Sequence, residues 1–133
     1  MYNCELDLWF EMPELNVGRH YHTSCTFNDR FIYVFCGIEN KSRKYINSIE
    51  FYDNDKKTNW RLIELSPKLF PERQGCGVHQ KDESTIIIFG GFNGRFLKDS
   101  YLFNVNSNKL TATNKLGSEC FMFQMPVCYD SKE

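Results

Sequence analysis

Three histidines stand in strand-like runs, and imidazole is a side chain that binds metal ions and transfers protons. His20 and His22 are two residues apart, so on an extended strand their side chains share one face. His79 lies in a similar run further along the chain. A metal centre needs several such ligands to converge, and no carboxylate or cysteine stands at ligand spacing from these three. We therefore expect hydrogen-bonded histidines and no metal site.

The cysteines are the second group of residues that could carry chemistry. None forms a C-x-x-C pair or lies at zinc-ligand spacing from a histidine. A thiol in an apolar strand behaves as a small hydrophobic side chain, and Cys36 ends such a strand, so we expect it to be packed and unreactive. Reduced thiols in an intracellular protein are expected for all six. They are Cys4, Cys25, Cys36, Cys76, Cys120 and Cys128.

Two loops carry residue types that are typical of protein interfaces, where arginine and aromatic side chains act as anchors. They span residues 38–47 and 92–98, and Asn93-Gly94 in the second predicts a turn. The alternative is that both loops are solvated and that their aromatic side chains pack back on the sheets. The residues that we expect to contact a partner are Lys41, Arg43, Lys44, Tyr45, Phe92, Asn93 and Arg95.

Composition and charge narrow the classes of function. The chain has 133 residues, a one-domain length, and its aromatic content of 16% favours strands. Its formal net charge of −1 provides no attraction to nucleic acid or to an anionic membrane. The first residues lack the apolar core of a signal peptide, and no apolar run approaches the roughly 20 residues that span a bilayer. No nucleophile elbow or phosphate-binding loop is present, so neither an enzyme nor a cofactor is expected.

An internal repeat organises the chain. Residues 19–37 align without a gap on residues 73–91 at an offset of 54. The offset then falls to 51, because the second loop is three residues shorter. A tyrosine and a tryptophan near the start, Tyr2 and Trp9, extend the period of roughly 50 residues to the beginning of the chain. The marks of the repeat are Arg19, Gly37, Tyr52 and Trp60 in one unit and Arg73, Gly90, Gly91 and Phe103 in the next.

Each repeat unit predicts four strands and no helix. Apolar or alternating runs are separated by polar turn sequences, and none shows a helical period. The predicted fold class is therefore all-β. The expected strands span residues 20–27, 31–35, 48–52 and 60–65 in the first unit, 75–80, 85–89, 100–103 and 110–113 in the second, and 121–125 as a degenerate strand.

The ordered marks resemble the kelch repeat: an arginine, a strand ending in Gly-Gly, a Tyr-Asp pair and a tryptophan. The resemblance covers residues 2 to about 116. This sequence departs from the pattern where Cys36 replaces the first glycine and Leu110 replaces the tryptophan. The resemblance implies a kelch-type β-propeller, with four-stranded antiparallel blades around a central channel. Trp9 and Trp60 would cover a neighbouring blade, and the arginines would tie loops to backbone carbonyls.

The expected divisions of the chain leave the ring incomplete. Residues 1–17 match the end of a preceding blade, residues 18–66 and 67–116 match two kelch blades, and residues 117–133 form a degenerate strand and tail. A propeller closes with at least about four blades. The chain is then a segment of a longer propeller, a unit completed by copies of itself or by another chain, or a small open array.

The resemblance implies a protein-interaction module, a scaffold or adaptor segment that binds a protein partner through its loops. We expect a cytoplasmic protein, with cytoskeletal association and ubiquitin-ligase adaptation both open. In adaptors of that kind, peptides are held at the positions of Ile38, Phe92, Tyr21 and Gly75, which here favour an apolar or aromatic surface. The alternatives are a catalytic propeller, either similar to the copper enzyme galactose oxidase or a sugar hydrolase, and a purely structural blade pair.

Overall fold

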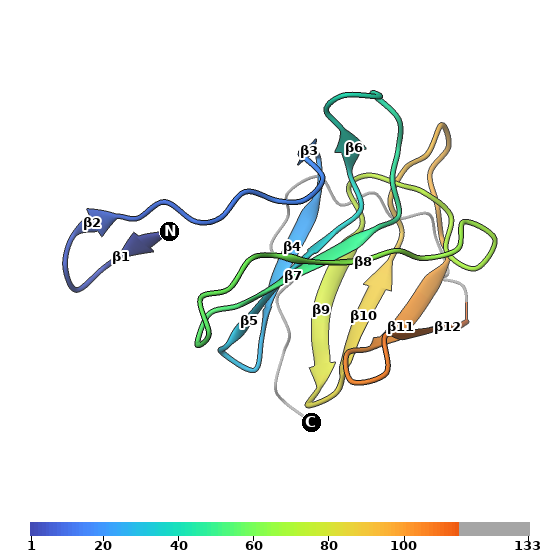
Figure 1. Ribbon diagram of the computed structural model, residues 1–133. Helices are drawn as coiled ribbons and strands as arrows, with labels where there is room; N and C mark the ends of the chain where they lie inside the picture. Colours follow the sequence, from blue (N-terminus) through green and yellow to red (C-terminus); the bar gives the residue numbers. More distant parts are fainter. Residues whose placement is uncertain (115–133) are drawn as a thin grey trace.

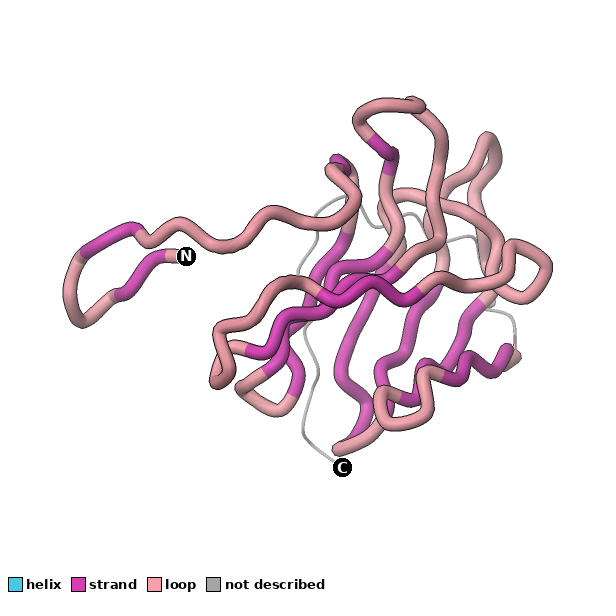
Figure 2. Tube along the Cα trace, in the orientation of Figure 1, coloured by secondary structure: helices cyan, strands magenta, loops and turns pink. Residues whose placement is uncertain are grey.

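The computed structural model describes residues 1–114, and this part of the chain is all-β, with twelve strands and no helix. Figure 1 shows two open sheets beside one another, and Figure 2 shows that loops make all the connections between them. Each of these sheets has four antiparallel strands, as the repeat predicted. No helix in this part of the chain is long and apolar enough to cross a membrane. The strand predicted at 121–125 and two cysteines, Cys120 and Cys128, lie outside the described residues.

The first sheet, blade 1, has the order β4-β5-β7-β8. Residues 28–30 close its first hairpin, in which the Arg30 N–H donates to the Phe27 carbonyl at 3.2 Å and Asn28 and Asp29 take left-handed φ angles of 48° and 50°. All five side chains of β5 are apolar, and the three consecutive residues at its end are buried, so this strand is covered on both faces. The strand bounds are β4 (Thr23–Phe27), β5 (Phe31–Phe35), β7 (Ile49–Asp53) and β8 (Arg61–Ile63).

The second sheet, blade 2, repeats this order in β9-β10-β11-β12. A glycine is required at its start, because a Cβ on Gly77 would lie 2.4 Å from the ring of Phe89 on the paired strand. The phenylalanine ring therefore crosses over the backbone of β9. The strand bounds are β9 (Gly77–Asp82), β10 (Thr85–Phe89), β11 (Ser100–Asn104) and β12 (Lys109–Ala112).

One hydrophobic core joins the two blades. Phe103 of blade 2 packs edge to face against Tyr33 and Phe35 of blade 1, with ring centroids 6.2 and 6.3 Å apart. The first strands of the blades, β4 and β9, lie side by side, and the Thr23 hydroxyl donates to the Cys76 carbonyl at 2.7 Å. Each large apolar side chain buried here contributes about 1.5–3 kcal/mol. Two blades packed in this way form an incomplete propeller-like fold.

The predicted strand over residues 20–27 is interrupted, so that prediction was wrong at its start. Arg19 and His20 form a separate strand, β3 (Arg19–His20), which pairs with β6 (Ile38–Glu39) in the loop after β5. Tyr21 then takes a left-handed φ of 54°, which turns the chain into β4. Gly75 holds the same place in blade 2 with a φ of 57°, and β9 begins two residues later. The break is therefore part of the repeat.

The N-terminal hairpin of β1 (Tyr2–Asn3) and β2 (Leu8–Trp9) projects from the blades (Figure 1). Trp9 is 79% exposed and contacts Tyr2 at 5.1 Å between centroids. Trp9 was predicted to cover a neighbouring blade, and this prediction is wrong. The residue lies on the hairpin that projects away from the blades, so its ring does not reach either four-stranded sheet. Trp60 packs on Tyr52 of its own blade at 5.4 Å, and its Nε1–H donates to the Pro13 carbonyl at 2.9 Å.

The repeat arginines tie loops to backbone carbonyls, as predicted. Arg73 is fully buried and donates from Nε to the Pro71 carbonyl and from Nη1 to the Gly90 carbonyl, each at 3.0 Å. Its two Nη groups also bind the two oxygens of Asp99 at 2.7 and 2.9 Å. The guanidinium lies over the ring of Phe70 at 4.5 Å. A buried charge needs this degree of pairing to be tolerated.

Blade 1 neutralises its buried arginine from a different position. Arg19 donates from Nη1 to the carbonyls of Cys36 and Ser48 and from Nη2 to Glu50 at 2.7 Å. Glu50 is fully buried and also accepts the backbone N–H groups of Asn16 and Val17. In the repeat alignment, Ser48 and Glu50 correspond to Asp99 and Tyr101. The carboxylate has therefore moved by two residues along the same face of the third strand.

An ion pair in blade 1 between a partly exposed arginine and a buried aspartate predicts acid sensitivity. Arg30 binds both oxygens of Asp53, at 2.9 and 2.7 Å, and this pairing lowers the pKa of Asp53 to about 2. The pKa of Asp53 is lower in the folded protein than in the unfolded chain. The stabilisation of the fold by this ion pair is therefore present above the ordinary pKa of 3.8 and is lost as the pH falls towards 2. We expect Asp53→Asn to lose less stability over this interval than the wild type, as measured by urea unfolding at several pH values.

The matched control for this prediction is Asp55→Asn. Asp55 meets the same arginine at 3.3 Å, but its side chain is 64% exposed. This variant should keep the acid sensitivity of the wild type. Equal pH dependence in the wild type and in Asp53→Asn would contradict the assignment.

Candidate functional site at the loop face

Backbone hydrogen bonds shape the loop over residues 38–47. The N–H of Glu39 donates to the Lys44 carbonyl at 3.0 Å, and the N–H of Arg43 donates to the Glu39 carbonyl at 2.9 Å. Ile38 and Tyr45 form a β-bridge, and Arg43 takes a left-handed φ of 59° at the tip. The loop is thus a closed hairpin that holds its cationic tip in a defined place.

The loop over residues 92–98 is a second, smaller hairpin. Phe92 and Phe96 form a β-bridge, and the N–H of Leu97 donates to the Gly91 carbonyl at 2.9 Å. The turn predicted at Asn93-Gly94 is present, with a φ of 102° at the glycine. Phe92 also exchanges two backbone hydrogen bonds of 2.9 Å with Gln74, which anchors this loop to the segment before β9.

Three aromatic side chains connect the two loops, and we call them the aromatic row: Tyr45, Phe92 and Phe96. The rings of Tyr45 and Phe92 meet edge to face at 6.3 Å, and those of Phe92 and Phe96 meet at 5.3 Å. Tyr45 comes from blade 1 and the two phenylalanines come from blade 2. The structure therefore brings two predicted site residues together. It adds Phe96, which is 50% exposed and whose only sequence signal was an aromatic type in the same loop.

The two loops that carry the aromatic row also carry cations. Lys41, Arg43 and Lys44 of the first loop and Arg95 of the second are all exposed. None of them makes an ion pair within residues 1–114, whereas Arg19, Arg30 and Arg73 are each paired with a carboxylate. We call the aromatic row together with these four cations the loop face.

A pocket of 250 Å³ opens beside the aromatic row. Its lining combines the ring of Tyr45 with two prolines, Pro67 and Pro71, from the segment between the blades. Glu72 and Asn93 add one carboxylate and one amide. The predicted residue Asn93 thus lines a pocket. The contribution of residues 67–72 was not anticipated, because their sequence reads only as a turn.

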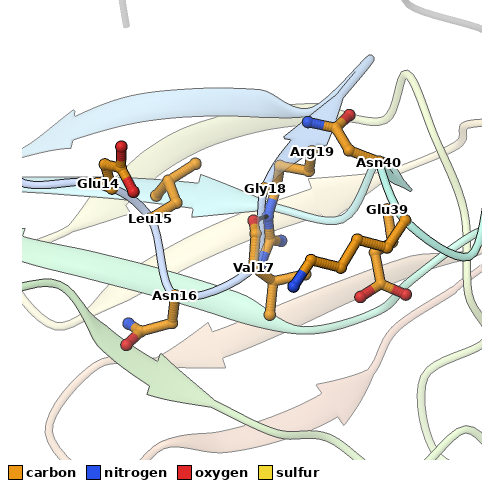
Figure 3. Close-up of a pocket in the computed structure, with 9 residues that line it drawn as sticks. Glu14, Leu15, Asn16, Val17, Gly18, Arg19, Glu39 and Asn40 are labelled. Atoms are coloured by element: carbon orange, nitrogen blue, oxygen red, sulfur yellow. Dashed lines mark hydrogen bonds between the residues drawn. The ribbon is translucent and has the colours of Figure 1, made fainter.

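A larger pocket of 530 Å³ lies where the chain enters blade 1. Figure 3 shows Glu14, Leu15, Asn16 and Val17 along one side and Glu39 and Asn40 on the other. Lys41 also lines it. Its arginine, Arg19, is already held by Glu50, so it offers no group to a ligand. This pocket borders the loop face but mixes charges of both signs.

The histidines and cysteines do not assemble into a metal site within the described part of the chain. His20 hydrogen-bonds through Nδ1 to Asn40 at 2.8 Å, as expected of a structural histidine, whereas His22 lies two residues further on and His79 lies on β9 of the other blade. Cys36 is completely buried, and this burial raises the pKa of its thiol, so it is the packed residue that was predicted. The four cysteines in residues 1–114 are all free thiols.

No protein-family model matches this chain, and no curated protein matches it. Its function is therefore inferred from the repeat and from the loop face.

Proposed function

We propose that this chain is a kelch-type propeller segment that binds a protein partner through the loop face. The observation that carries the proposal is the aromatic row, which spans loops of both blades and is flanked by four exposed cations. Aromatic and arginine side chains supply most of the binding energy at protein interfaces. Loops on a rigid scaffold are also the usual place for such contacts.

The kelch assignment is supported by the physical roles of the repeat marks. Arg19 and Arg73 each hold the carbonyl at the end of their second strand. Gly37 and Gly91 follow these strands with φ angles of 108° and 104°, where a side chain would be strained. Further blades, in a longer propeller or on other chains or copies, would complete the ring, and a cytoplasmic location would keep the cysteines reduced.

The test of binding is the double variant Tyr45→Ala/Phe96→Ala. Truncating two anchors of one interface is expected to reduce partner retention by at least about 30-fold. Quantitative affinity capture from cell extract, with partners identified by mass spectrometry, measures this loss. Neither backbone bridge in the loops depends on these side chains, so circular dichroism should remain that of the wild type.

The control is Tyr2→Ala/Phe10→Ala, which removes the same two residue types from the projecting hairpin, where both are exposed. It should retain the partner that the loop-face variant loses. Equal retention by the wild type and by both variants would refute the loop face as the binding site.

A further inference from the structure

We infer that the loop face recognises an acidic protein segment in which an apolar side chain lies between carboxylates; this inference rests on the proposed function. The charge distribution is the first observation. The 17 residues of the two loops, 38–47 and 92–98, contain five basic residues and one acidic residue, a net charge of +4. The whole chain has a net charge of −1, so the other 116 residues carry −5. Within residues 1–114, the residues outside the two loops include 9 basic and 13 acidic ones, a net charge of −4, so the loops differ in sign from the remainder.

The positive charge of the loop face is not consumed by internal pairing. Glu39, the one carboxylate in the two loops, accepts a hydrogen bond from the Ser42 hydroxyl. No lysine or arginine pairs with Glu39 within the described part of the chain. Charged groups placed on one surface steer a complementary partner and set its orientation. The loop face is therefore complementary to an acidic surface.

The pocket beside the aromatic row supplies the apolar part of the recognition. Tyr45, Pro67 and Pro71 offer carbon surface around a volume of 250 Å³, which suits one aliphatic or aromatic side chain. Lys44 is adjacent in sequence to Tyr45, and Arg95 follows Asn93 by two residues, so both loops that contribute to the pocket lining also carry cations. Glu72 and Asn93 each have an oxygen that can accept an N–H of the partner backbone.

The ring geometry favours a protein segment over a single-stranded nucleic acid. Bases bind by stacking on aromatic faces that are open to them. In the aromatic row, neighbouring rings are steeply inclined, at interplanar angles of 77° and 62°, so each ring presents an edge to the next. The described residues outside the loops carry a net charge of −4, which would also repel a polyanion that extends beyond the loop face. A short acidic segment avoids this repulsion.

Fluorescence anisotropy with defined probes tests the inference. The probe is a labelled peptide in which one leucine is flanked on both sides by glutamate and aspartate, and its comparison peptide carries glutamine and asparagine instead. We expect binding of the acidic peptide alone, weakening about tenfold as salt rises from about 50 to about 300 mM and the charges are screened. Oligouridylate and phosphatidylserine vesicles should bind more weakly than the acidic peptide.

Two matched charge reversals locate the binding site. Lys41→Glu/Lys44→Glu is expected to weaken acidic-peptide binding by at least about tenfold, because it changes the charge of the loop face by −4. Lys56→Glu/Lys57→Glu makes the same chemical change in the turn between β7 and β8, at the other end of β7 from the loop face. Both of its lysines are exposed. This control should bind within about twofold of the wild type, since the turn lies beyond a Debye length from the loops.

Each contrary outcome is distinct. Equal binding of the acidic and amide peptides, tighter binding of oligouridylate or vesicles, or no acidic-peptide binding up to about 1 mM would overturn the inference. If any of these occurs while Tyr45→Ala/Phe96→Ala still loses its captured partner, the proposed function stands and only the acidic chemistry is wrong. A different outcome is that Lys41→Glu/Lys44→Glu weakens acidic-peptide binding while Tyr45→Ala/Phe96→Ala still retains the captured partner. In that case the acidic chemistry stands, and only the role of the aromatic row in partner binding is wrong.

Discussion

Replacing Arg73 with leucine is expected to lower the free energy of unfolding by about 3–5 kcal/mol, most of the stability of a small domain. The side chain is fully buried, and its removal leaves two carbonyls, of Pro71 and Gly90, without their donor. The Asp99 carboxylate loses its counter-ion in a partly buried site. Leucine would fill part of the volume but satisfy none of these groups.

Urea unfolding followed by tryptophan fluorescence measures the loss in Arg73→Leu. The control is Arg30→Leu. It makes the same substitution at an ion-paired arginine whose side chain is 36% exposed. This guanidinium is partly solvated, so its loss should cost clearly less than that of the fully buried Arg73. A loss in Arg73→Leu no larger than that in the control would contradict a structural role for the buried network.

Gly91→Ala is expected to cost about 3 kcal/mol. Gly91 has a φ of 104°, and a Cβ there would lie 2.8 Å from the carbonyl oxygen of Gln74. That oxygen accepts the Phe92 N–H at 2.9 Å, so relieving the clash would move Phe92 as well. The backbone strain costs about 1–2 kcal/mol, and the overpacking adds a similar amount. Binding at the loop face should therefore weaken together with stability.

Gly94→Ala separates the two contributions. Gly94 has a similar φ of 102°, but no atom lies within 4 Å of a Cβ built on it. It should therefore show the strain alone, about 1–2 kcal/mol, and leave Phe92 in place. Equal losses of unfolding free energy in the two alanine variants, in the same urea experiment, would show that the contact with Gln74 is unimportant.

The second and third strands of each blade could be predicted closely from the sequence. Residues 31–35 and 85–89 are short apolar runs bounded by polar turns, and both were predicted with the bounds that the structure has. These strands could be predicted because an apolar run between two turns is visible in the local sequence, and the repeat contains this pattern twice. The all-β class and the four-stranded sheets followed from the same pattern.

Contacts between distant segments could not be predicted in this way. The sequence indicated that Tyr45 and Phe92 belong to partner-binding loops, but their mutual contact depends on how blade 1 packs on blade 2. Pro67 and Pro71 line the pocket only because of the path that the chain takes from β8 to β9, which the sequence does not indicate. The break was missed in both blades, because the predicted strands included Tyr21 and began at Gly75. A tyrosine at positive φ has no local sequence signal, although a glycine in the same place is such a signal.

The displaced carboxylate has a consequence for how such repeats diverge. Blade 1 places its counter-ion at Glu50 and blade 2 places its own at Asp99, although both serve the same buried arginine position. An exchange of third strands between the blades would also exchange these positions. Each arginine would then meet a carboxylate that the surrounding loop is not built to receive. Each blade is therefore one electrostatic module, in which the buried arginine and its carboxylate have to be exchanged together.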